Sequence, residues 1–406
     1  MTAFSPTSSP TPATPTPPLS HLEVDLAAVE ANLRALRTRL APGTAVCGIV
    51  KKNAYGHGAV MTAHRLVKAG CDMLGVFAPA EAEELGAAAV TAPLLLLYPL
   101  RHLSRSEGIF RAAAAGRLHL TVQDRDQLKA VAEIGRTYAT RLPLHVYVDT
   151  GMSRAGIAPD DLGAVLAEIR DATHLTLAGV MSHLATADDD GARAAEQDAS
   201  FAAVLTEHAD AVGDATVHLA NSAGVRRDTA LHRQMVRPGL GLYGIGPLDG
   251  VPAEELRPAL RWVSRVFSAA AYPKGAAVGY GGTHRLRKKT LLGLVPVGYG
   301  DGYPLGLSNR AVVRVRAGAG IGEPSAWFDA EVRGRVNMDQ ISVDLTAAAK
   351  ALDVTDPGEL RGLEVEVYAS EPDAPNTVER LAGLAKSHAY ELLCRLPREL
   401  PRRYGQ

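Results

Sequence analysis

The sequence contains little of what marks disulfide-bonded or metal-binding proteins. It has 3 cysteines and 2 tryptophans in 406 residues, and aromatic residues make up 5% of the chain. An odd number of widely spaced cysteines in apolar surroundings forms neither a disulfide framework nor a metal site. We therefore expect Cys47, Cys71 and Cys394 to be reduced core residues, no bound metal, and a reducing compartment, the cytoplasm.

Charge of one sign is not in excess either. Lys and Arg number 43 against 44 Asp and Glu, and the formal net charge is -1. Binding to nucleic acid or to an anionic membrane favours a basic excess, which this chain lacks. No uninterrupted apolar segment of membrane-spanning length is found, and residues 1–20 lack the basic start and the apolar stretch of a signal peptide. We expect neither nucleic acid nor a membrane as a partner.

Length and composition divide the chain into three parts. One hydrophobic core rarely organises 406 residues, so two domains are expected. Residues 1–20 hold six prolines and nine serines or threonines. Such a composition cannot bury enough apolar surface to offset the entropy of ordering, which predicts a disordered tail. The two domains are then residues 21–257 and residues 258–406.

Residues 21–257 alternate short apolar runs with alanine-rich amphipathic stretches. Eight strands separated by helices favour a (β/α)8 barrel of the TIM type, an α/β fold whose chemistry lies on the loops after the strands. The candidate strands are Ala45–Val50, Met73–Phe77, Pro93–Leu97, Leu118–Val122, Leu142–Val148, Leu175–Met181, Thr216–Leu219 and Gln234–Val236.

From residue 258 the pattern changes to strand-like runs without long intervening helices, which predicts a mainly β domain. The apolar residues of Thr377–Arg395 have helical spacing, and we expect this helix to pack on the β domain. The candidate strands are Trp262–Ala271, Thr290–Val297, Ala311–Val315, Ala330–Val336 and Leu363–Tyr368.

Lys51 ends the first apolar run and opens the polar, glycine-rich segment Lys51-Lys52-Asn53-Ala54-Tyr55-Gly56-His57-Gly58. A buried strand that ends in such a loop delivers its last residue to a pocket. Burial lowers the pKa of a lysine and favours the neutral amine, the form that condenses with an aldehyde. Successive strand side chains point to opposite faces, so only one of Lys51 and Lys52 can enter the pocket. The segment alone leaves open a solvated charge pair at a strand end.

Further motifs follow in order along the chain. They are Asp149-Thr150-Gly151-Met152-Ser153-Arg154-Ala155-Gly156, Gly179-Val180-Met181-Ser182-His183, His218-Leu219-Ala220-Asn221-Ser222-Ala223, Arg237-Pro238-Gly239-Leu240-Gly241-Leu242-Tyr243-Gly244, Ala277-Val278-Gly279-Tyr280-Gly281-Gly282-Thr283, Val297-Gly298-Tyr299-Gly300-Asp301-Gly302 and Gly334-Arg335-Val336-Asn337-Met338-Asp339-Gln340. Together with the Lys51 segment, these motifs resemble those of alanine racemases, and the resemblance covers about residues 21 to 404.

The resemblance implies a fold-type III pyridoxal phosphate enzyme that interconverts L- and D-alanine and supplies D-alanine for peptidoglycan. It assigns the cofactor lysine to Lys51, which would be one base, and the second base on the opposite face of the α-carbon to Tyr280. The implied cofactor contacts are Lys51, Tyr55, Arg154, His183, Ser222, Arg237, Gly239, Leu240 and Tyr390. The implied substrate contacts are Arg154, Tyr299, Met338 and Asp339. The implied assembly is a head-to-tail homodimer in which the β domain of one subunit reaches the lysine of the other.

Two positions affect the implied chemistry. Arg237 would face the pyridine nitrogen, and because an arginine accepts no proton, the ring would be a poorer electron sink and side reactions would be restrained. At position 147 the family commonly has a carbamylated lysine whose anion holds the arginine matching Arg154, but this chain has Tyr147. A neutral partner gives about half the strength of a charged one. We expect Arg154 to be held less firmly, with activity altered rather than abolished.

Two other interpretations stay open. A relative of the same architecture could act on another amino acid, as a racemase of other or broader range or as a decarboxylase, although decarboxylation does not require an opposed base such as Tyr280. A cofactor-binding protein with weak catalysis is suggested by Tyr147 and by Lys52, which stands where a small residue is usual. Motifs do not reveal the substrate side chain, because pocket width depends on loop positions.

Overall fold

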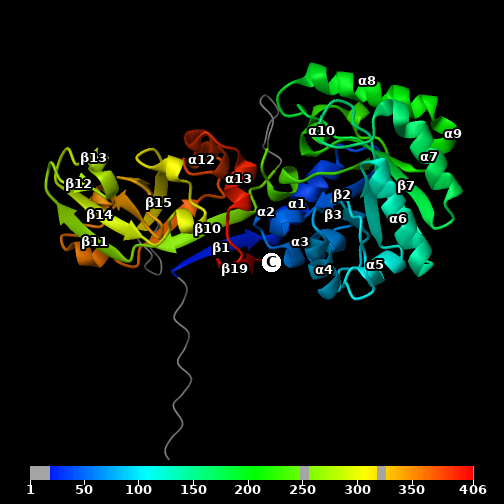
Figure 1. Cartoon of the computed structure of the whole chain (residues 1–406). Coiled ribbons are helices and arrows are strands. Elements are labelled where there is room, and N and C mark those ends of the chain that lie inside the picture. Colours follow the sequence, from blue (N-terminus) through cyan, green and yellow to red (C-terminus); the bar gives the residue numbers. More distant parts are fainter. Residues whose placement is uncertain (1–18, 247–255, 318–325, 406) are drawn as a thin grey trace, which may run out of the picture.

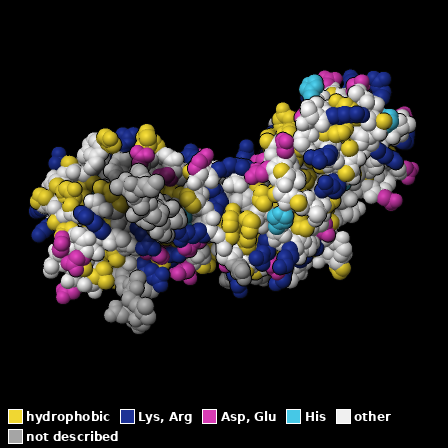
Figure 2. All heavy atoms as spheres, turned by 90° about the horizontal axis from the view of Figure 1, so that it is seen from below, with side chains coloured by type: hydrophobic (Ala, Val, Ile, Leu, Met, Phe, Trp, Pro, Cys, Tyr) yellow, Lys and Arg dark blue, Asp and Glu magenta, His cyan; other side chains and the backbone are white. Residues whose placement is uncertain are grey.

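The computed structural model describes residues 19–246, 256–317 and 326–405. The predicted tail lies outside this range except for Leu19 and Ser20. Figure 1 shows a barrel surrounded by helices beside a mainly β domain. None of the helices in the described ranges combines the length and apolarity that crossing a bilayer requires. Acidic and basic side chains are interspersed on the face seen in Figure 2.

Eight parallel strands close the barrel in the order β2 to β9, which confirms the predicted TIM-like fold. Each strand lies within one of the predicted apolar runs. They are β2 (Ala45–Ile49), β3 (Met73–Val76), β4 (Leu94–Leu96), β5 (Leu118–Val122), β6 (Leu142–Tyr147), β7 (Leu175–Met181), β8 (Thr216–His218) and β9 (Met235–Val236).

The helices around the barrel begin at polar caps where the sequence supplies them. The N–H of Ala28 donates to Asp25 Oδ1 (2.9 Å), and the N–H of Gln127 donates to Asp124 Oδ1 (2.8 Å), so both helix starts satisfy a free backbone donor. The helices are α1 (Leu26–Arg37), α2 (Lys51–Tyr55), α3 (Ala59–Lys68), α4 (Pro79–Ala87), α5 (Phe110–Ala114), α6 (Arg125–Tyr138), α7 (Leu162–Asp171), α8 (Gly191–Glu207), α9 (Ala209–Val212) and α10 (Ser222–Arg227).

The second domain is built on a six-stranded mixed sheet, a three-stranded antiparallel sheet and a hairpin. A six-stranded sheet has the order β16-β15-β18-β10-β1-β19, a three-stranded sheet the order β11-β14-β17, and β12 pairs with β13. Its strands are β10 (Leu260–Arg265), β11 (Ser268–Tyr272), β12 (Ala277–Val278), β13 (His284–Arg285), β14 (Thr290–Val295), β15 (Val312–Ala317), β16 (Ala326–Glu331), β17 (Ile341–Asp344) and β18 (Glu364–Tyr368). Its helices are α11 (Thr346–Ala351), α12 (Val378–Ala385) and α13 (Ala389–Cys394).

Both ends of the described chain lie in the sheet of the second domain. β1 (Ser20–Asp25) pairs antiparallel with β10 and parallel with β19 (Arg402–Gly405). The first strand therefore pairs with the β domain, although it precedes the barrel in the sequence. Arg402 also donates to the carbonyl of Gly56 in the barrel (2.7 Å), so the end of the chain ties the two domains together.

Three predicted elements differ from the observed ones. The run Trp262–Ala271 is two strands, β10 and β11, which belong to different sheets. β16 ends at Glu331, so most of the run Ala330–Val336 is not a strand. The predicted terminal helix is divided at Lys386, whose φ of +54° ends α12. Its second part, α13, contacts α2 of the barrel rather than packing on the β domain alone.

Candidate active site

A cavity of about 570 Å³ opens at the carboxyl ends of the barrel strands. Eight of the cofactor contacts implied by the resemblance line it: Lys51, Tyr55, Arg154, His183, Ser222, Arg237, Gly239 and Tyr390. Leu240 follows Gly239 and is buried. The structure thus brings together the predicted residues of the barrel, and it adds Tyr390 from α13.

Lys51 enters this cavity and Lys52 does not. Lys51 continues the inward face of β2, because Ile49 two residues earlier also lines the cavity. Burial lowers the pKa of Lys51, and the nearby charge of Arg154 lowers it further. Lys52 is exposed, and its Nζ lies 5.9 Å from the centre of the Phe77 ring. The register therefore places Lys51, whose pKa is lowered, inside the site.

The short element α2 is a left-handed turn after Lys51 rather than a regular α-helix. Lys52, Asn53, Ala54 and Tyr55 have φ values of 53°, 55°, 52° and 50°. Residues with a Cβ avoid this conformation, at a cost of roughly 1–2 kcal/mol each. Asn53 supports the turn, because its Oδ1 accepts from the N–H of Ala59 (2.9 Å) and its carbonyl accepts from the N–H of Gly58 (2.9 Å). The turn places the Tyr55 ring at the cavity, 5.9 Å from the ring of Tyr390.

Asp149 organises the loop that carries Arg154. Its Oδ1 accepts from the N–H groups of Gly151 (3.0 Å), Met152 (2.9 Å) and Ser153 (3.1 Å). A Cβ at Gly156, which has φ of +126°, would lie 2.7 Å from the backbone nitrogen of Asp149. The aspartate and the glycines of this motif therefore shape the loop, and Arg154 is the member that faces the cavity.

Tyr147 lies beside the Arg154 loop with a buried hydroxyl. The side chain is 4% exposed, and its Oη has no hydrogen-bond partner at bonding geometry among the described residues. Burial raises the pKa of Tyr147, while Arg154 acts in the opposite direction, both through its charge and as a nearby hydrogen-bond donor. A neutral, unsatisfied hydroxyl in the wall of a cavity suits a polar ligand that can complete its bonding.

Arg237 is fixed from three sides at the end of β9. Its Nη1 bonds to His218 Nδ1 (2.7 Å), and its Nη2 donates to the carbonyls of Ser182 (2.6 Å) and Leu219 (3.2 Å). Burial lowers the pKa of Arg237 to about 10, so it remains a cation near neutral pH. His183 lies 3.4 Å from Nη2, and burial together with the Arg237 charge lowers its pKa to about 3. A fixed cation thus faces a neutral imidazole.

Ser222 and Gly239 form a cradle of small groups. The Ser222 Oγ accepts from the N–H groups of Gly239 (2.8 Å) and Gly241 (3.1 Å), which leaves its hydroxyl proton to donate into the cavity. A Cβ at Gly239 would lie 2.8 Å from Tyr55 Oη, so glycine is required for this approach. The Gly239 N–H, expected to face a phosphate, is engaged by Ser222 in this structure.

Four predicted residues lie elsewhere, on the β domain. Tyr280, Tyr299 and Met338 are 72%, 47% and 55% exposed, and Asp339 is also exposed. Tyr299 and Met338 belong to one patch, since the N–H of Gly300 donates to the Met338 carbonyl (2.9 Å). None of the four lines the cavity of its own chain.

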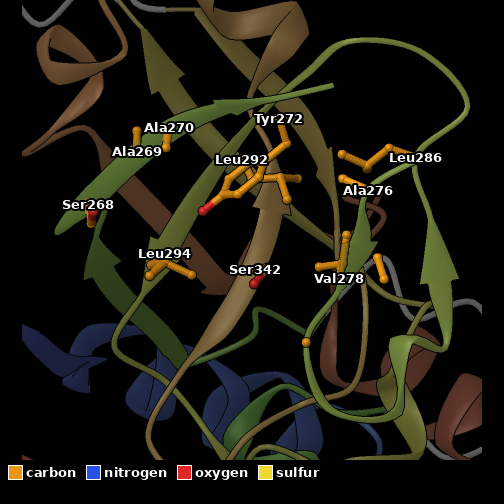
Figure 3. A pocket seen from close by; sticks show the side chains of 12 residues that line it. Ser268, Ala269, Ala270, Tyr272, Ala276, Val278, Leu286, Leu292, Leu294 and Ser342 are labelled. Atoms are coloured by element: carbon orange, nitrogen blue, oxygen red, sulfur yellow. The ribbon is translucent and has the colours of Figure 1, made fainter. Parts of the chain in front are cut away.

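A smaller cavity of about 130 Å³ lies under the segment that carries Tyr280. β12 forms one wall, and the other walls come from β11, β14 and Ser342 of β17. In Figure 3, Tyr272 and Leu292 lie in the middle of this space, with Val278 and Leu286 at the side of the hairpin. Val278, Leu286 and Leu292 form a small core separate from the main one. Tyr280 thus sits on a hairpin with a small, incompletely filled interior.

The motifs did not assign roles to several residues that the structure places at the site. Thr121, Gln123, Met152 and Asp188 also line the cavity, and His218 contacts Arg237 directly. His218 falls at an inward position of a predicted strand, and strand alternation was the signal that could have identified it.

Comparison with known proteins agrees with this geometry. Residues 24–247 match the family model described as alanine racemase, N-terminal domain, and residues 259–404 match alanine racemase, C-terminal domain. The alanine racemase of Symbiobacterium thermophilum is 36% identical over 387 residues, which cover 94% of this chain and 96% of that protein.

Solved structures give the same result. The alanine racemase from D-cycloserine-producing Streptomyces lavendulae has a TM-score of 0.83 at 32% identity, covering 96% of this chain and 98% of that one. The alanine racemase from Bartonella henselae, described with covalently bound pyridoxal phosphate, has a TM-score of 0.78 at 26% identity, covering 96% and 100%. The resemblance found in the motifs is confirmed, and the chain belongs to the alanine racemase family.

Proposed function

We propose that this protein is a pyridoxal 5'-phosphate-dependent racemase that interconverts L- and D-alanine, with D-alanine supply for peptidoglycan as its role. Family membership supports the reaction class. The observation that carries the proposal is Lys51, a half-buried lysine with a lowered pKa, in the same cavity as Arg237. Cys47 and Cys71 are buried as predicted, whereas Cys394 is exposed on α13, so the prediction of a core position was wrong for it; all three thiols are free, which supports a cytoplasmic location.

The cavity fits the cofactor in chemistry. The unsatisfied Tyr147 hydroxyl and the free hydroxyl proton of Ser222 are polar groups that a phosphorylated pyridine can pair with. We assign the phosphate to the hydroxyls of Ser222, Tyr55 and Tyr390 and to the Leu240 backbone, while the Gly239 N–H bonds to Ser222 Oγ and orients that hydroxyl. We assign the pyridine nitrogen to Arg237, the ring face to His183, and the phenolic oxygen to Arg154. Pyridoxal phosphate, when bound, supplies a conjugated system that stabilises negative charge at the α-carbon.

The protein supplies orientation and proton transfer. The lowered pKa of Lys51 makes its Nζ able to accept the α-proton from one face of the substrate. Arg237 keeps its own protons, so it limits how much negative charge the pyridine nitrogen takes up. Inversion also requires a proton donor on the opposite face, which we assign to the hydroxyl of Tyr280.

We further propose that a second copy of the chain completes the cavity in a head-to-tail homodimer. Tyr280 is 72% exposed and lies outside the cavity of its own chain. The same holds for Tyr299, Met338 and Asp339, which we assign to the substrate side of the partner's site. A surface that is needed in another copy's cavity accounts for large side chains exposed on one patch.

Complementation between two inactive variants tests the shared site. Lys51→Ala and Tyr280→Phe should each abolish racemisation. After subunit exchange, half of the dimers contain one chain of each kind, and each of these has one intact site of two, so about a quarter of wild-type activity should return. An exchanged mixture with no activity would show that Lys51 and Tyr280 do not meet across subunits.

Isotope exchange tests the reaction and the substrate. The loaded protein is incubated in deuterated water with L-alanine, L-serine or L-lysine, and α-deuterium, enantiomer ratio and carbon dioxide release are measured. Alanine should gain deuterium and racemise without release of carbon dioxide. Turnover of serine or lysine without turnover of alanine would overturn the substrate assignment, and carbon dioxide release would identify a decarboxylase.

A further inference from the structure

Three histidines form a hydrogen-bonded row inside the barrel behind Arg237. Arg237 Nη1 is 2.7 Å from His218 Nδ1, His218 Nε2 is 2.7 Å from His145 Nδ1, and His145 Nε2 is 2.9 Å from His119 Nδ1. His218 and His145 are 0% and 1% exposed. The row therefore runs from the cavity into the barrel interior, across strands β8, β6 and β5.

The row depends on a glycine in β7, the strand between β6 and β8. Gly179 pairs with His145 on one side and with Thr216 on the other. A Cβ at Gly179 would lie 2.3 Å from His145 Nδ1 and 2.7 Å from the Thr216 carbonyl oxygen. Only the absence of a side chain allows His145 to reach across β7 to His218.

The hydrogen bonds of the row can run in one direction only. Arg237 has donors and no acceptor, so His218 Nδ1 must accept and its Nε2 must carry the proton. His218 Nε2 then donates to His145 Nδ1, and His145 Nε2 in turn donates to His119 Nδ1. The arginine thus determines the tautomer of each ring, and each ring in turn needs an acceptor beyond it.

His119 is the last acceptor of this row. If the Nδ1 of His119 is lost, His145 has two alternatives. It keeps its Nε2 proton, which then has no partner in the row, or it moves the proton to Nδ1, where it faces the Nε2 proton of His218. Either outcome weakens the bond between His218 and Arg237. We propose that His119 is a positioning residue for Arg237, acting through His145 and His218. The inference deepens the proposed function, since it rests on Arg237 as the group that faces the cofactor ring.

Two variants of similar shape separate this role from packing. His119→Asn keeps an acceptor oxygen near the position of Nδ1, whereas His119→Leu has none. For packing alone, leucine should be at least as well tolerated as asparagine, because position 119 is half-buried in a barrel strand. For the proposed role the order is reversed: His119→Asn should keep kcat within about twofold of wild type, and His119→Leu should lower kcat about tenfold with KM within about twofold. Equal kcat in both variants, or a lower kcat in His119→Asn, would overturn the proposal.

A measurement without cofactor or substrate keeps the test independent of activity. In ¹⁵N-histidine-labelled protein, nitrogen chemical shifts should report His218 and His145 as Nε2–H tautomers, and His119→Leu, unlike His119→Asn, should shift the His218 nitrogens. Unchanged His218 shifts in His119→Leu would refute the row. If the row is observed but the wild-type protein does not racemise alanine, the proposed function fails and the tautomer assignment stands.

A histidine outside the row provides the control. His232 is 2% exposed and belongs to the barrel domain. Among the described residues, its Nε2 bonds to the Val225 carbonyl (3.0 Å) and its Nδ1 has no partner. His232→Leu should lower stability while leaving kcat per folded enzyme and the His218 shifts unchanged. A loss of kcat in His232→Leu equal to that in His119→Leu would contradict a specific role for the row.

Discussion

The buried hydroxyl of Tyr147 leads to a prediction about two states of the protein. Its Oη makes no hydrogen bond at bonding geometry within the described ranges, although Arg154 lies close enough to act on it as a donor, and the side chain is 4% exposed. An unsatisfied buried polar group costs about 1–3 kcal/mol. Because the charge of Arg154 offsets part of this cost, Tyr147→Phe should raise the free energy of unfolding of the cofactor-free protein by about 1 kcal/mol, at the low end of that range.

In the protein with bound cofactor, the stabilising effect of Tyr147→Phe should vanish or reverse. If the phenol gains a partner when pyridoxal phosphate binds, Tyr147→Phe loses that bond and the cofactor Kd should rise roughly tenfold. Urea unfolding of both forms, with a cofactor titration, measures the two effects. Tyr303→Phe is a matched control, because the Tyr303 hydroxyl is also buried without a partner but lies in the β domain. Tyr303→Phe should change the free energy of unfolding of both forms by the same amount. The reasoning is refuted if Tyr147→Phe does the same, or if it destabilises the cofactor-free protein.

The remaining predictions concern charge. Tyr147→Lys should raise the racemisation rate when bicarbonate is added, because a carbamate would give Arg154 an anionic partner, and an unchanged rate counts against weak positioning of Arg154. Glu366→Gln should lower the free energy of unfolding by about 3 kcal/mol, because the buried carboxylate accepts hydrogen bonds from Arg261 Nε (2.7 Å) and Arg314 Nε (2.6 Å). Arg398→Ala removes an exposed ion pair with Glu84 and should lower the free energy of unfolding by less than about 1 kcal/mol. Burial lowers the pKa values of His57, His145 and His183 to about 4, 3 and 3, against roughly 6.5 in the unfolded chain. Below pH 6.5 the unfolded chain binds protons that the folded chain does not, so stability present above that pH should fall on acidification by about 1.4 kcal/mol per pH unit for each histidine. Equal urea midpoints at pH 7 and pH 5 would contradict this.

Local sequence patterns were sufficient to predict the strands of the barrel but not those of the second domain. Each barrel strand is buried and pairs with its neighbours in order, so a short apolar run identified it. β1 and β19 are paired with strands distant in the sequence, and no local signal marks such a partner. The run Trp262–Ala271 has the sequence pattern of one strand because both of its halves favour extended structure, although they enter different sheets.

At the site, residue identities were predictable and the supporting geometry was not. Alternation along β2 limits the cavity to one of two lysines, and the motif selected Lys51. The left-handed turn from Lys52 to Tyr55 contains no glycine, so turn chemistry did not reveal it. The missing partner of Tyr147 and the reach of His145 across Gly179 depend on distances between strands. Such distances arise only when the barrel closes.

The pairing of β1 with β10 and β19 also determines when the fold can be completed during synthesis. The eight barrel strands are all present once Val236 has been made, so the barrel can close on a chain that is still growing. β1 has no strand to pair with until β10 is made, and its other edge stays open until residues 402–405 are added. An unpaired strand edge is prone to pair with other chains. For this protein the interval between the synthesis of Asp25 and that of Arg402 is therefore the period in which chaperone protection of the first strand matters most.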